Sequence, residues 1–186
     1  GKYFLKVNEA QRYPQMFEKE ANGLIALKDN CSLTMPLVLK HGIAGNDQYL
    51  LLEWLEKGTP KPDCQQQLGA GLAMLHKKPQ PWFGWKEDNY IGSLPQSNTQ
   101  HNNWHSFYAE CRIMPLAEKL FRHGSFSKQQ LVNTESLCKK MDQRFPSEPA
   151  SLLHGDLWSG NYMVITNGYA ALFDPAVYCG HREMDI

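Results

Sequence analysis

The 186-residue sequence balances nineteen lysines and arginines against nineteen aspartates and glutamates, so no net field recruits nucleic acid or an anionic membrane. Its hydrophobic content of 42% and charged content of 20% are those of an ordinary globular protein, with one substantial core or two small lobes. Five scattered cysteines without a C-x-x-C pair argue against a disulfide framework and against structural zinc, and they favour a reducing compartment.

No apolar stretch approaches the roughly 20 residues that a membrane helix needs, and no secretory signal opens the chain. We therefore expect a cytoplasmic protein that binds neither membrane nor nucleic acid. The chain starts at Gly1 without Met, already in a strand-like pattern, and it stops at Ile186 inside a segment that reads as continuing. From this pattern we expect a piece of a longer protein.

Residues 1–55 predict a β-rich unit that contains one helix. A short strand over residues 3–8 carries Lys6, and a helix follows from about residue 14 to residue 28. Glu20 lies on the apolar face of that helix, where an unpaired carboxylate would cost several kcal/mol, so we expect a cationic partner for it. Two further strands complete the unit, over residues 36–44 and 48–55.

Residues 56–186 predict a mainly helical unit, which makes the fold class α+β. The segment EKGTPKP (56–62) predicts a linker because it is rich in Gly and Pro. Residues 79–100 are polar but also contain several aromatic side chains, and they predict an ordered loop. Helices are predicted over 63–77, over 103–123 with Gly124 as its stop, and from Ser127, where Ser127 and Gln130 form a capping box.

The segments HGDLWSGN (154–161) and YMVITNGYAALFD (162–174) contain the most informative pattern. Two apolar runs flank Asn167-Gly168, the preferred pair for a two-residue type I′ turn, and they predict a β-hairpin. A two-residue turn would pair Asn161 with Asp174 across the strands. Because Mg²⁺ takes oxygen ligands, this pairing predicts a magnesium site beside Asp156.

The spacing His-x-Asp-x-x-x-x-Asn, followed by Asp after a short hairpin, is typical of the catalytic loop and metal-binding aspartate of kinases. In that chemistry Asp156 orients the attacking hydroxyl and accepts its proton, while Asn161 and Asp174 hold Mg²⁺. Lys6 contacts the α- and β-phosphates of ATP, and Glu20 fixes Lys6, which supplies the expected cationic partner. His154 is predicted to be a buried scaffold residue, because Asp156 already fills the role of the base.

Several residues differ from the protein-kinase motifs, and these differences restrict the class of acceptor molecule. Gly155 stands where protein kinases usually carry Arg, and Asp174 is followed by Pro175-Ala176 and not by Phe-Gly. Trp158 follows the predicted base by two positions, and its flat indole suits the apolar face of a sugar ring better than a peptide. The sequence therefore points to a small-molecule or sugar-like acceptor.

Segments along nearly the whole chain resemble the fructosamine (ketosamine) kinase family, a branch near the aminoglycoside phosphotransferases. The likeness is almost letter for letter in LLHGDLWSGN (152–161) and FDPAVYCGHREMDI (173–186). Four more segments agree in order and spacing: FLKVN (4–8), MFEKEANGL (16–24), LLLEWL (50–55) and NNWHSFYAECRI (102–113).

The resemblance implies an ATP- and Mg²⁺-dependent kinase that phosphorylates the third sugar carbon of ketoamines, free or on protein lysines, and so permits deglycation. It implies a two-lobed protein-kinase-like fold, with a partial N-lobe over 1–55 and a partial C-lobe over 56–186. The family's glycine-containing phosphate loop and C-terminal helices would lie outside these residues. Adenine would bind backbone groups around Glu53, Trp54 and Leu55, although which peptides bind it stays open.

Two other functions remain open. The acceptor could be an aminoglycoside, a choline-like alcohol or another metabolite, or the chain could belong to a nucleotide-binding pseudokinase. A zinc site at His101 and His105 is disfavoured because no third ligand is evident. The physiological acceptor and the oligomeric state are left open by the sequence.

Overall fold

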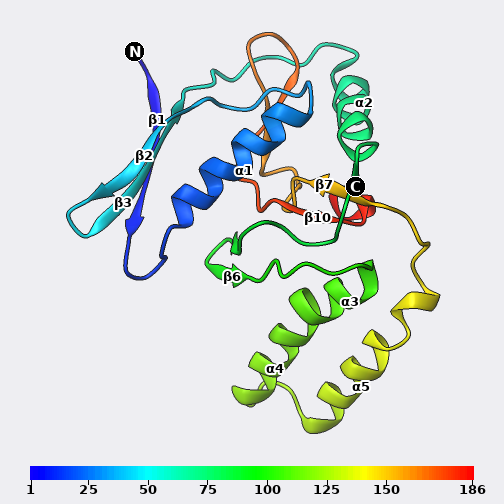
Figure 1. The fold of residues 1–186 in the computed structure, drawn as a ribbon. Helices are drawn as coiled ribbons and strands as arrows, with labels where there is room; N and C mark the ends of the chain where they lie inside the picture. Colours follow the sequence, from blue (N-terminus) through cyan, green and yellow to red (C-terminus); the bar gives the residue numbers. More distant parts are fainter.

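In the computed structural model, which describes residues 1–186, the N-terminal part of the chain forms a three-stranded antiparallel sheet (Figure 1). Its strand order is β1-β3-β2. The strands are β1 (Tyr3–Glu9), β2 (Val38–Ala44) and β3 (Asp47–Glu53), and Lys6 on β1 lies opposite Leu50 on β3. Side chains alternate between the faces of a strand, so Phe4 and Lys6 share one face of β1.

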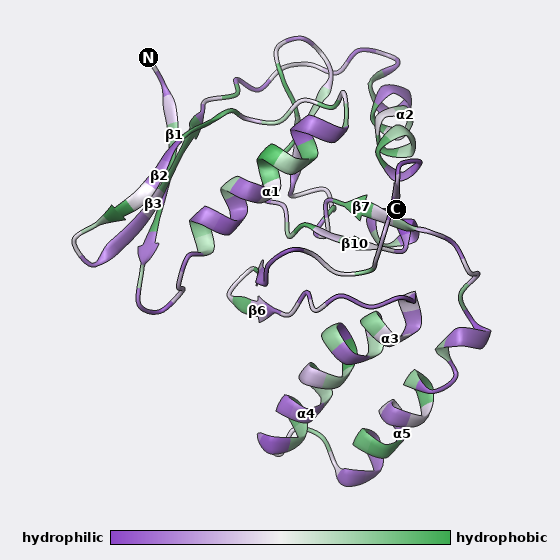
Figure 2. Cartoon of the chain, viewed as in Figure 1, coloured by the Kyte–Doolittle hydropathy of each residue, from purple (hydrophilic) through white to green (hydrophobic).

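Helix α1 (Met16–Asn30) lies beside this sheet and packs an apolar stripe into the core (Figure 1). In Figure 2 the helix carries both hydrophilic and hydrophobic residues along its length. It begins two residues later than predicted, because Gln15 has a left-handed φ of 59° that interrupts the chain before Met16, and it also ends two residues later, where Cys31 is extended. The buried side chains of this helix include Phe17, Ala21, Leu24 and Leu27.

The rest of the chain combines short strands with helices, so the fold is mixed α+β as predicted. A second three-stranded sheet has the order β10-β7-β4, and two hairpins pair β5 with β6 and β8 with β9. The bounds are α2 (Cys64–His76), β4 (Pro79–Gln80), β5 (Asn89–Ile91), β6 (Leu94–Gln96), β7 (Ala150–Leu153), β8 (Tyr162–Val164), β9 (Ala170–Leu172) and β10 (Tyr178–Gly180).

The predicted single helix over 103–123 is instead an α-helix, a π-helical segment and a second α-helix. These are α3 (Trp104–Tyr108), the π-helical Ala109–Ile113 and α4 (Met114–Arg122). Gly124 ends the run with a positive φ of 75°. Helix α5 (Lys128–Cys138) follows, and the predicted capping box of Ser127 and Gln130 is confirmed. Two short 3-10 helices complete the elements, Met141–Gln143 and Arg182–Asp185.

The predicted linker over 56–62 is instead paired with the β8–β9 hairpin. The amide of Gly58 donates to the carbonyl of Val164 at 2.9 Å, and the amide of Thr166 donates to the carbonyl of Glu56 at 3.1 Å. A Cβ on Gly58 would lie 2.3 Å from the Ile165 carbonyl oxygen, so only glycine permits this approach. The boundary between residues 55 and 56 stays a prediction.

One buried cluster joins α1, β3, α2, α3, β7, β9 and β10 into a common core. Trp104 and Phe107 belong to it, and Tyr108 packs against it. Within residues 79–100, the expected ordered loop contains β4 and the β5–β6 hairpin, which the sequence pattern did not indicate. None of the helices combines the length and the apolar character that spanning a bilayer requires.

Candidate active site

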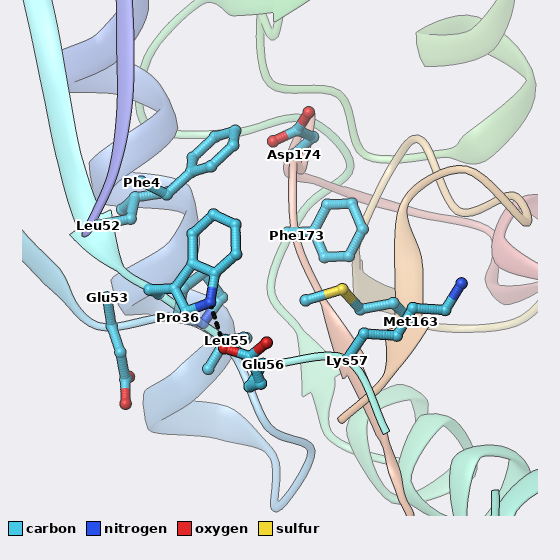
Figure 3. Close-up of a pocket in the computed structure, with 11 residues that line it drawn as sticks. Phe4, Pro36, Leu52, Glu53, Leu55, Glu56, Lys57, Met163, Phe173 and Asp174 are labelled. Carbon is cyan, nitrogen blue, oxygen red and sulfur yellow. Dashed lines mark hydrogen bonds between the residues drawn. The ribbon is translucent and has the colours of Figure 1, made fainter. Parts of the chain in front are cut away.

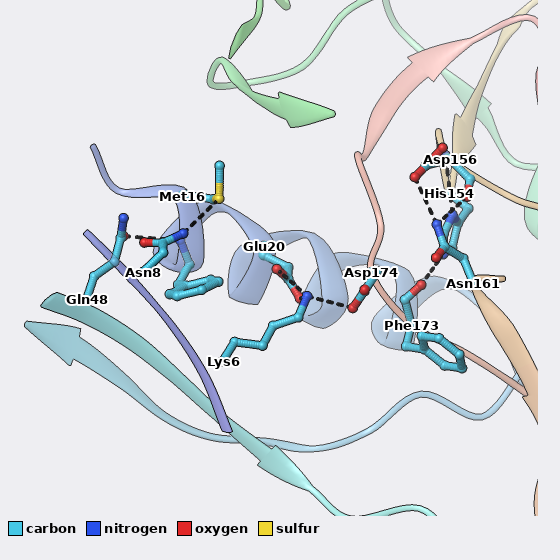
Figure 4. A network of polar contacts seen from close by, with 11 residues as sticks. Lys6, Asn8, Met16, Glu20, Gln48, His154, Asp156, Asn161, Phe173 and Asp174 are labelled. Carbon is cyan, nitrogen blue, oxygen red and sulfur yellow. Dashed lines mark hydrogen bonds and ion pairs between the residues drawn. The ribbon is translucent and has the colours of Figure 1, made fainter. Parts of the chain in front are cut away.

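Lys6 reaches from β1 to two carboxylates on different elements. Its Nζ lies 2.7 and 2.9 Å from the two carboxylate oxygens of Glu20 on α1, and 2.6 Å from Oδ1 of Asp174, which follows β9 (Figure 4). Glu20 thus has the cationic partner that its place on an apolar helix face requires. Burial alone would lower the pKa of Lys6, but the attraction and hydrogen bonds of Glu20 and Asp174 outweigh burial and raise it. The Lys6 ammonium therefore stays charged.

The β8–β9 hairpin has a different register from the one predicted. Tyr162 pairs with Leu172, and the amide of Phe173 donates to the carbonyl of Asn161 at 3.0 Å. Asn161 therefore lies opposite Phe173, and the predicted pairing with Asp174 is wrong by one residue.

The physical reason for the shift is the length of the turn. The amide of Ile165 donates to the carbonyl of Tyr169 at 3.0 Å, so Thr166, Asn167 and Gly168 all lie in the turn. Gly168 has a φ of 86°, and the side-chain oxygen of Asn167 accepts from the amide of Tyr169. A three-residue turn with a left-handed glycine is the next commonest hairpin after the two-residue form.

In a regular strand, a register shifted by one residue would place the Asp174 side chain on the opposite face of the hairpin. The backbone at Asp174 is not regular, and it changes the direction of this side chain. Asp174 has a φ of 56°, a left-handed conformation that costs a non-glycine residue roughly 1–2 kcal/mol. With this conformation, the Asp174 side chain lies on the side of Lys6. A cavity of about 230 Å³ is lined by the six residues Lys6, Glu20, Asp156, Trp158, Asn161 and Asp174, together with α1 and β5 residues. The predicted proximity of these side chains is therefore retained despite the shifted register.

Asp156 and Asn161 are hydrogen-bonded to each other within residues 154–161, the predicted catalytic loop. Nδ2 of Asn161 donates to the Asp156 carbonyl at 2.8 Å and to Asp156 Oδ2 at 2.9 Å (Figure 4). This leaves Oδ1 of Asp156, Oδ1 of Asn161 and Oδ2 of Asp174 without a hydrogen bond from the protein. Uncommitted amide and carboxylate oxygens at one cavity are the donor set that a hard divalent cation such as Mg²⁺ prefers, so the residues fit that ion.

The fully buried carboxylate of Asp185 anchors the start of the catalytic loop. It accepts from the amides of His154 at 2.7 Å and Gly155 at 2.9 Å, and Nε2 of His76 lies 3.1 Å away. Gly155 has a φ of 82°, and a Cβ there would lie 2.1 Å from the Ala176 carbonyl oxygen. The sequence carried no signal for the roles of Asp185 and His76, because both depend on residues distant in the chain.

His154 connects the catalytic loop to the hairpin. Its Nδ1 accepts from the amide of Asp156 at 3.3 Å, so the proton resides on Nε2, which donates to the Phe173 carbonyl at 3.0 Å. Burial lowers the pKa of His154 and keeps the imidazole neutral. His154 is completely buried, in agreement with the scaffold role predicted for it.

A second cavity of about 330 Å³ adjoins the first, and Asp174 lines both. Figure 3 shows it with Phe4 and Leu52 on the side of the sheet and with Met163 and Phe173 on the side of the hairpin. The predicted hinge residues Glu53, Trp54 and Leu55 also line this cavity. The pocket therefore has apolar walls on two sides and a stretch of backbone along its edge.

The hinge peptides differ in the hydrogen bonds that they already make. The amide of Glu53 donates to the Leu37 carbonyl at 2.9 Å, and its carboxylate accepts from the Leu37 amide at 3.1 Å. The backbone groups of Trp54 and Leu55 make no hydrogen bond within the protein, while Trp54 Nε1 donates to Glu56 at 2.8 Å. Trp54 and Leu55 therefore present free backbone donors and acceptors.

Trp158 lies at the rim of the 230 Å³ cavity. Its side chain lines the cavity together with Asp156 and is 61% exposed. A Cβ on Gly160 would lie 2.3 Å from the indole ring, so Gly160 gives the ring room to lie against the loop. An exposed flat ring beside Asp156 is available to contact a bound molecule.

The sequence matches the fructosamine kinase family over residues 1–186. It is 40% identical to a probable ketoamine kinase of Synechocystis, covering 100% of this chain and 62% of the relative. It is 37% identical to a chloroplastic protein-ribulosamine 3-kinase of Oryza sativa subsp. indica, covering 100% of this chain and 55% of the relative.

Two solved structures have the same fold. A putative fructosamine-3-kinase from Haemophilus somnus superposes with a TM-score of 0.87 at 29% identity, covering 99% of this chain and 61% of that chain. One from Thermobifida fusca gives a TM-score of 0.85 at 33% identity, covering 98% and 63%. The chain thus spans less than two thirds of the length of these relatives, and over that span it belongs to the fructosamine kinase family.

Proposed function

We propose that the protein is an ATP- and Mg²⁺-dependent kinase that phosphorylates a hydroxyl of a ketosamine, with a role in protein deglycation. The observation that carries this proposal is the single cavity lined by Lys6, Glu20, Asp156, Asn161 and Asp174. Phosphoryl transfer needs little covalent chemistry from the protein, and it depends on positioned charges and oxygen ligands of this kind.

Bound ATP would supply the phosphoryl group, and Mg²⁺ would neutralise charge on its phosphate oxygens. Asn161 and Asp174 would hold the metal through the oxygens that the protein leaves uncommitted. No group of three or more His, Cys, Asp or Glu side chains could hold a metal ion here, so phosphate oxygens and water would complete the shell. Lys6 would exchange its contact with Asp174 for the phosphates while Glu20 keeps it in place.

Asp156 would receive the proton of the attacking hydroxyl on Oδ1, because Oδ2 is engaged by Asn161. Asn161 thereby fixes the rotation of the Asp156 carboxylate as well as offering its own oxygen to the metal. Trp158 would cover the apolar face of the sugar beside this carboxylate. The names of the relatives, probable ketoamine kinase and protein-ribulosamine 3-kinase, support this acceptor class.

Adenine would occupy the larger cavity, between the apolar side chains of the sheet and those of the hairpin. Its polar edge would bond to the backbone of Trp54 and Leu55, since the amide of Glu53 is already engaged by Leu37. This arrangement would divide the chain into an N-lobe over 1–55 and a C-lobe over 56–186, with the nucleotide between them.

The test is an acceptor screen on the protein at its natural full length, with ATP and Mg²⁺ and with ADP release as the readout. Fructosamine- and ribulosamine-type compounds should turn over, whereas an aminoglycoside and choline should not. Turnover only with the latter two would reject the acceptor class. Nucleotide binding without turnover of any acceptor would identify a pseudokinase.

Two variants link the chemistry to the site. Asp156→Asn should lose about 10²–10⁴-fold in kcat because it removes the proton acceptor, and it should still bind nucleotide. Asp47→Asn replaces an exposed carboxylate on β3 and should leave kcat unchanged. Equal activity of the two variants would contradict the role of Asp156.

A further inference from the structure

Three amide side chains are buried together beneath the segment that follows Asp174. Asn89, Gln96 and Asn98 are 7%, 5% and 1% exposed, and we call them the amide brace. Nε2 of Gln96 and Nδ2 of Asn98 both donate to Oδ1 of Asn89 at 3.0 Å. Two donors on one oxygen fix the orientation of the Asn89 amide, so its own donor has a defined direction.

That donor is used on the backbone after Asp174. Nδ2 of Asn89 donates to the Val177 carbonyl at 2.7 Å, and Nε2 of Gln96 reaches the Ala176 carbonyl at 3.4 Å. The amide of Ala176 in turn donates to the His154 carbonyl at 2.9 Å. Both polar groups of Ala176 and the carbonyl of Val177 are therefore held, and this path fixes where the chain leaves Asp174.

Asp174 needs such a restraint because its backbone is strained. Its φ of 56° is left-handed, and the next residue is Pro175, which favours an extended conformation in the residue before it. A strained residue persists only where the surrounding structure over-determines its conformation. The amide brace and His154 supply that surrounding structure on the C-terminal side of Asp174.

The same part of the chain also contacts helix α1, which carries Glu20. Nδ2 of Asn22 donates to Glu87 at 3.0 Å, and the Tyr90 hydroxyl donates to the Pro14 carbonyl at 3.1 Å. A Cβ on Gly23 would lie 3.0 Å from a Val177 methyl group, so α1 packs directly on the braced segment. Residues 87–98 thus connect the helix of Glu20 with the strand that follows Asp174.

We propose that Asn89 is a positioning residue for Asp174, and that the amide brace fixes the direction in which the chain leaves Asp174. The inference rests on the proposed function, because it assigns Asp174 to the metal of the nucleotide. Asn89 also lines the 230 Å³ cavity, but its side-chain donor is engaged by the Val177 carbonyl and its oxygen accepts from Gln96 and Asn98, so we assign its action to the backbone after Asp174. No residue of the amide brace lines the larger, adenine-side cavity, so its loss should leave that cavity intact.

The experiment compares Asn89→Ala with Asn103→Ala in the protein at its natural full length. Asn103 caps α3 by accepting from the Ser106 amide at 2.9 Å, so its variant also loses a local hydrogen bond but does not touch the segment after Asp174. Amide hydrogen exchange over residues 174–180 measures the positioning without any reaction. Exchange there should be about 10-fold or more faster in Asn89→Ala and unchanged in Asn103→Ala.

Nucleotide affinity, measured with and without Mg²⁺, provides the second readout. Asn89→Ala should weaken ATP binding about 10-fold in the presence of Mg²⁺ and leave binding without Mg²⁺ unchanged, because only the metal contact depends on Asp174. An equal loss in both conditions, or equal exchange in the two variants, would overturn the proposal.

Failure of the proposed function can be distinguished from failure of the role proposed for Asn89. If the wild type binds no nucleotide, the proposed function fails, while hydrogen exchange still decides whether Asn89 positions the segment. If Asn89→Ala does not fold, Gln96→Met replaces it, because this change removes one donor to Asn89 and the longer bond to Ala176 while conserving volume. Amide exchange over residues 174–180 should then also be faster than in the wild type, by a smaller factor than expected for Asn89→Ala. Unchanged exchange in Gln96→Met would contradict the proposal.

Discussion

Nζ of Lys6 lies 2.6 Å from Oδ1 of Asp174, although 168 positions separate the two residues. The contact joins the first strand of the sheet to the second residue after the last strand of the hairpin. Glu20 engages the same ammonium from α1 at 2.7 Å. The strand β1, the helix α1 and the segment after β9 therefore meet at the ammonium group of Lys6.

Lys6→Met should lower kcat/KM by at least about 100-fold, because the phosphates lose their positioned cation. It should also destabilise the protein by about 3 kcal/mol, since Glu20 is left largely buried without a partner. The double variant Lys6→Met with Glu20→Gln should regain most of that stability and none of the activity. Urea denaturation and steady-state kinetics on all three proteins provide the measurement. A double variant as unstable as the single one would refute this explanation.

Asp185→Ala should cost about 3 kcal/mol of stability and also lower kcat, because two buried backbone amides and His76 lose their acceptor. His76→Gln should have a smaller effect in the same direction, since it disturbs only one of the three contacts. Chemical denaturation and turnover should rank the variants in that order. Wild-type kcat in Asp185→Ala would show that the catalytic loop does not need this anchor.

Gly168→Ala and Gly69→Ala should shift stability in opposite directions. Gly168 has a φ of 86° in the hairpin turn, so alanine there should cost about 1–2 kcal/mol. Gly69 lies on the exposed side of α2, where an added Cβ would meet no other atom within 4 Å, and alanine there should add about 0.5–1 kcal/mol. Thermal unfolding distinguishes the two. A stabilised Gly168→Ala would contradict the three-residue turn.

The stability of the protein should fall on mild acidification because of His154. Burial holds its folded-state pKa below the ordinary 6.5, so between those two values the unfolded chain binds a proton that the folded chain does not. The stabilisation is therefore complete above about pH 6.5 and decreases below it, at most by about 1.4 kcal/mol per pH unit. His154→Asn should lack this part of the decrease when urea unfolding is compared at several pH values. If the free energy of unfolding depends on pH equally in the wild type and in His154→Asn, this role of His154 is wrong.

The proximity of the predicted site residues could be anticipated because most of them lie close together in the sequence. Asp156, Asn161 and Asp174 fall within one loop and one hairpin, and a short spacing restricts where they can go. Lys6 and Glu20 are distant, but Glu20 on an apolar helix face already required a cation. The capping box at Ser127 was equally local, and it is confirmed.

What the sequence did not determine depends on single residues or on distant contacts. Asn167-Gly168 suits both a two-residue turn and a three-residue turn with a left-handed glycine, so the register of the hairpin was open by one residue. The π-helical segment at Ala109–Ile113 has no pattern of its own. Strand β7 is a short apolar run that periodicity cannot distinguish from part of a helix.

The pairing of residues 56–58 with the hairpin has a mechanical consequence. Because Gly58 is hydrogen-bonded to Val164 and Glu56 to Thr166, this stretch is held to the β8–β9 hairpin. The chain also meets the hairpin at Thr34, whose carbonyl accepts from the amide of Leu172 at 2.9 Å. A rotation of the β1–β3–β2 sheet relative to the hairpin must then be taken up at two connections, the stretch between Thr34 and β2 and the peptides of Trp54 and Leu55, whose backbone groups make no hydrogen bond within the protein. A base bound to the peptides of Trp54 and Leu55 would lie at one of these two connections, so binding in the pocket would restrict the orientation of the sheet relative to the hairpin.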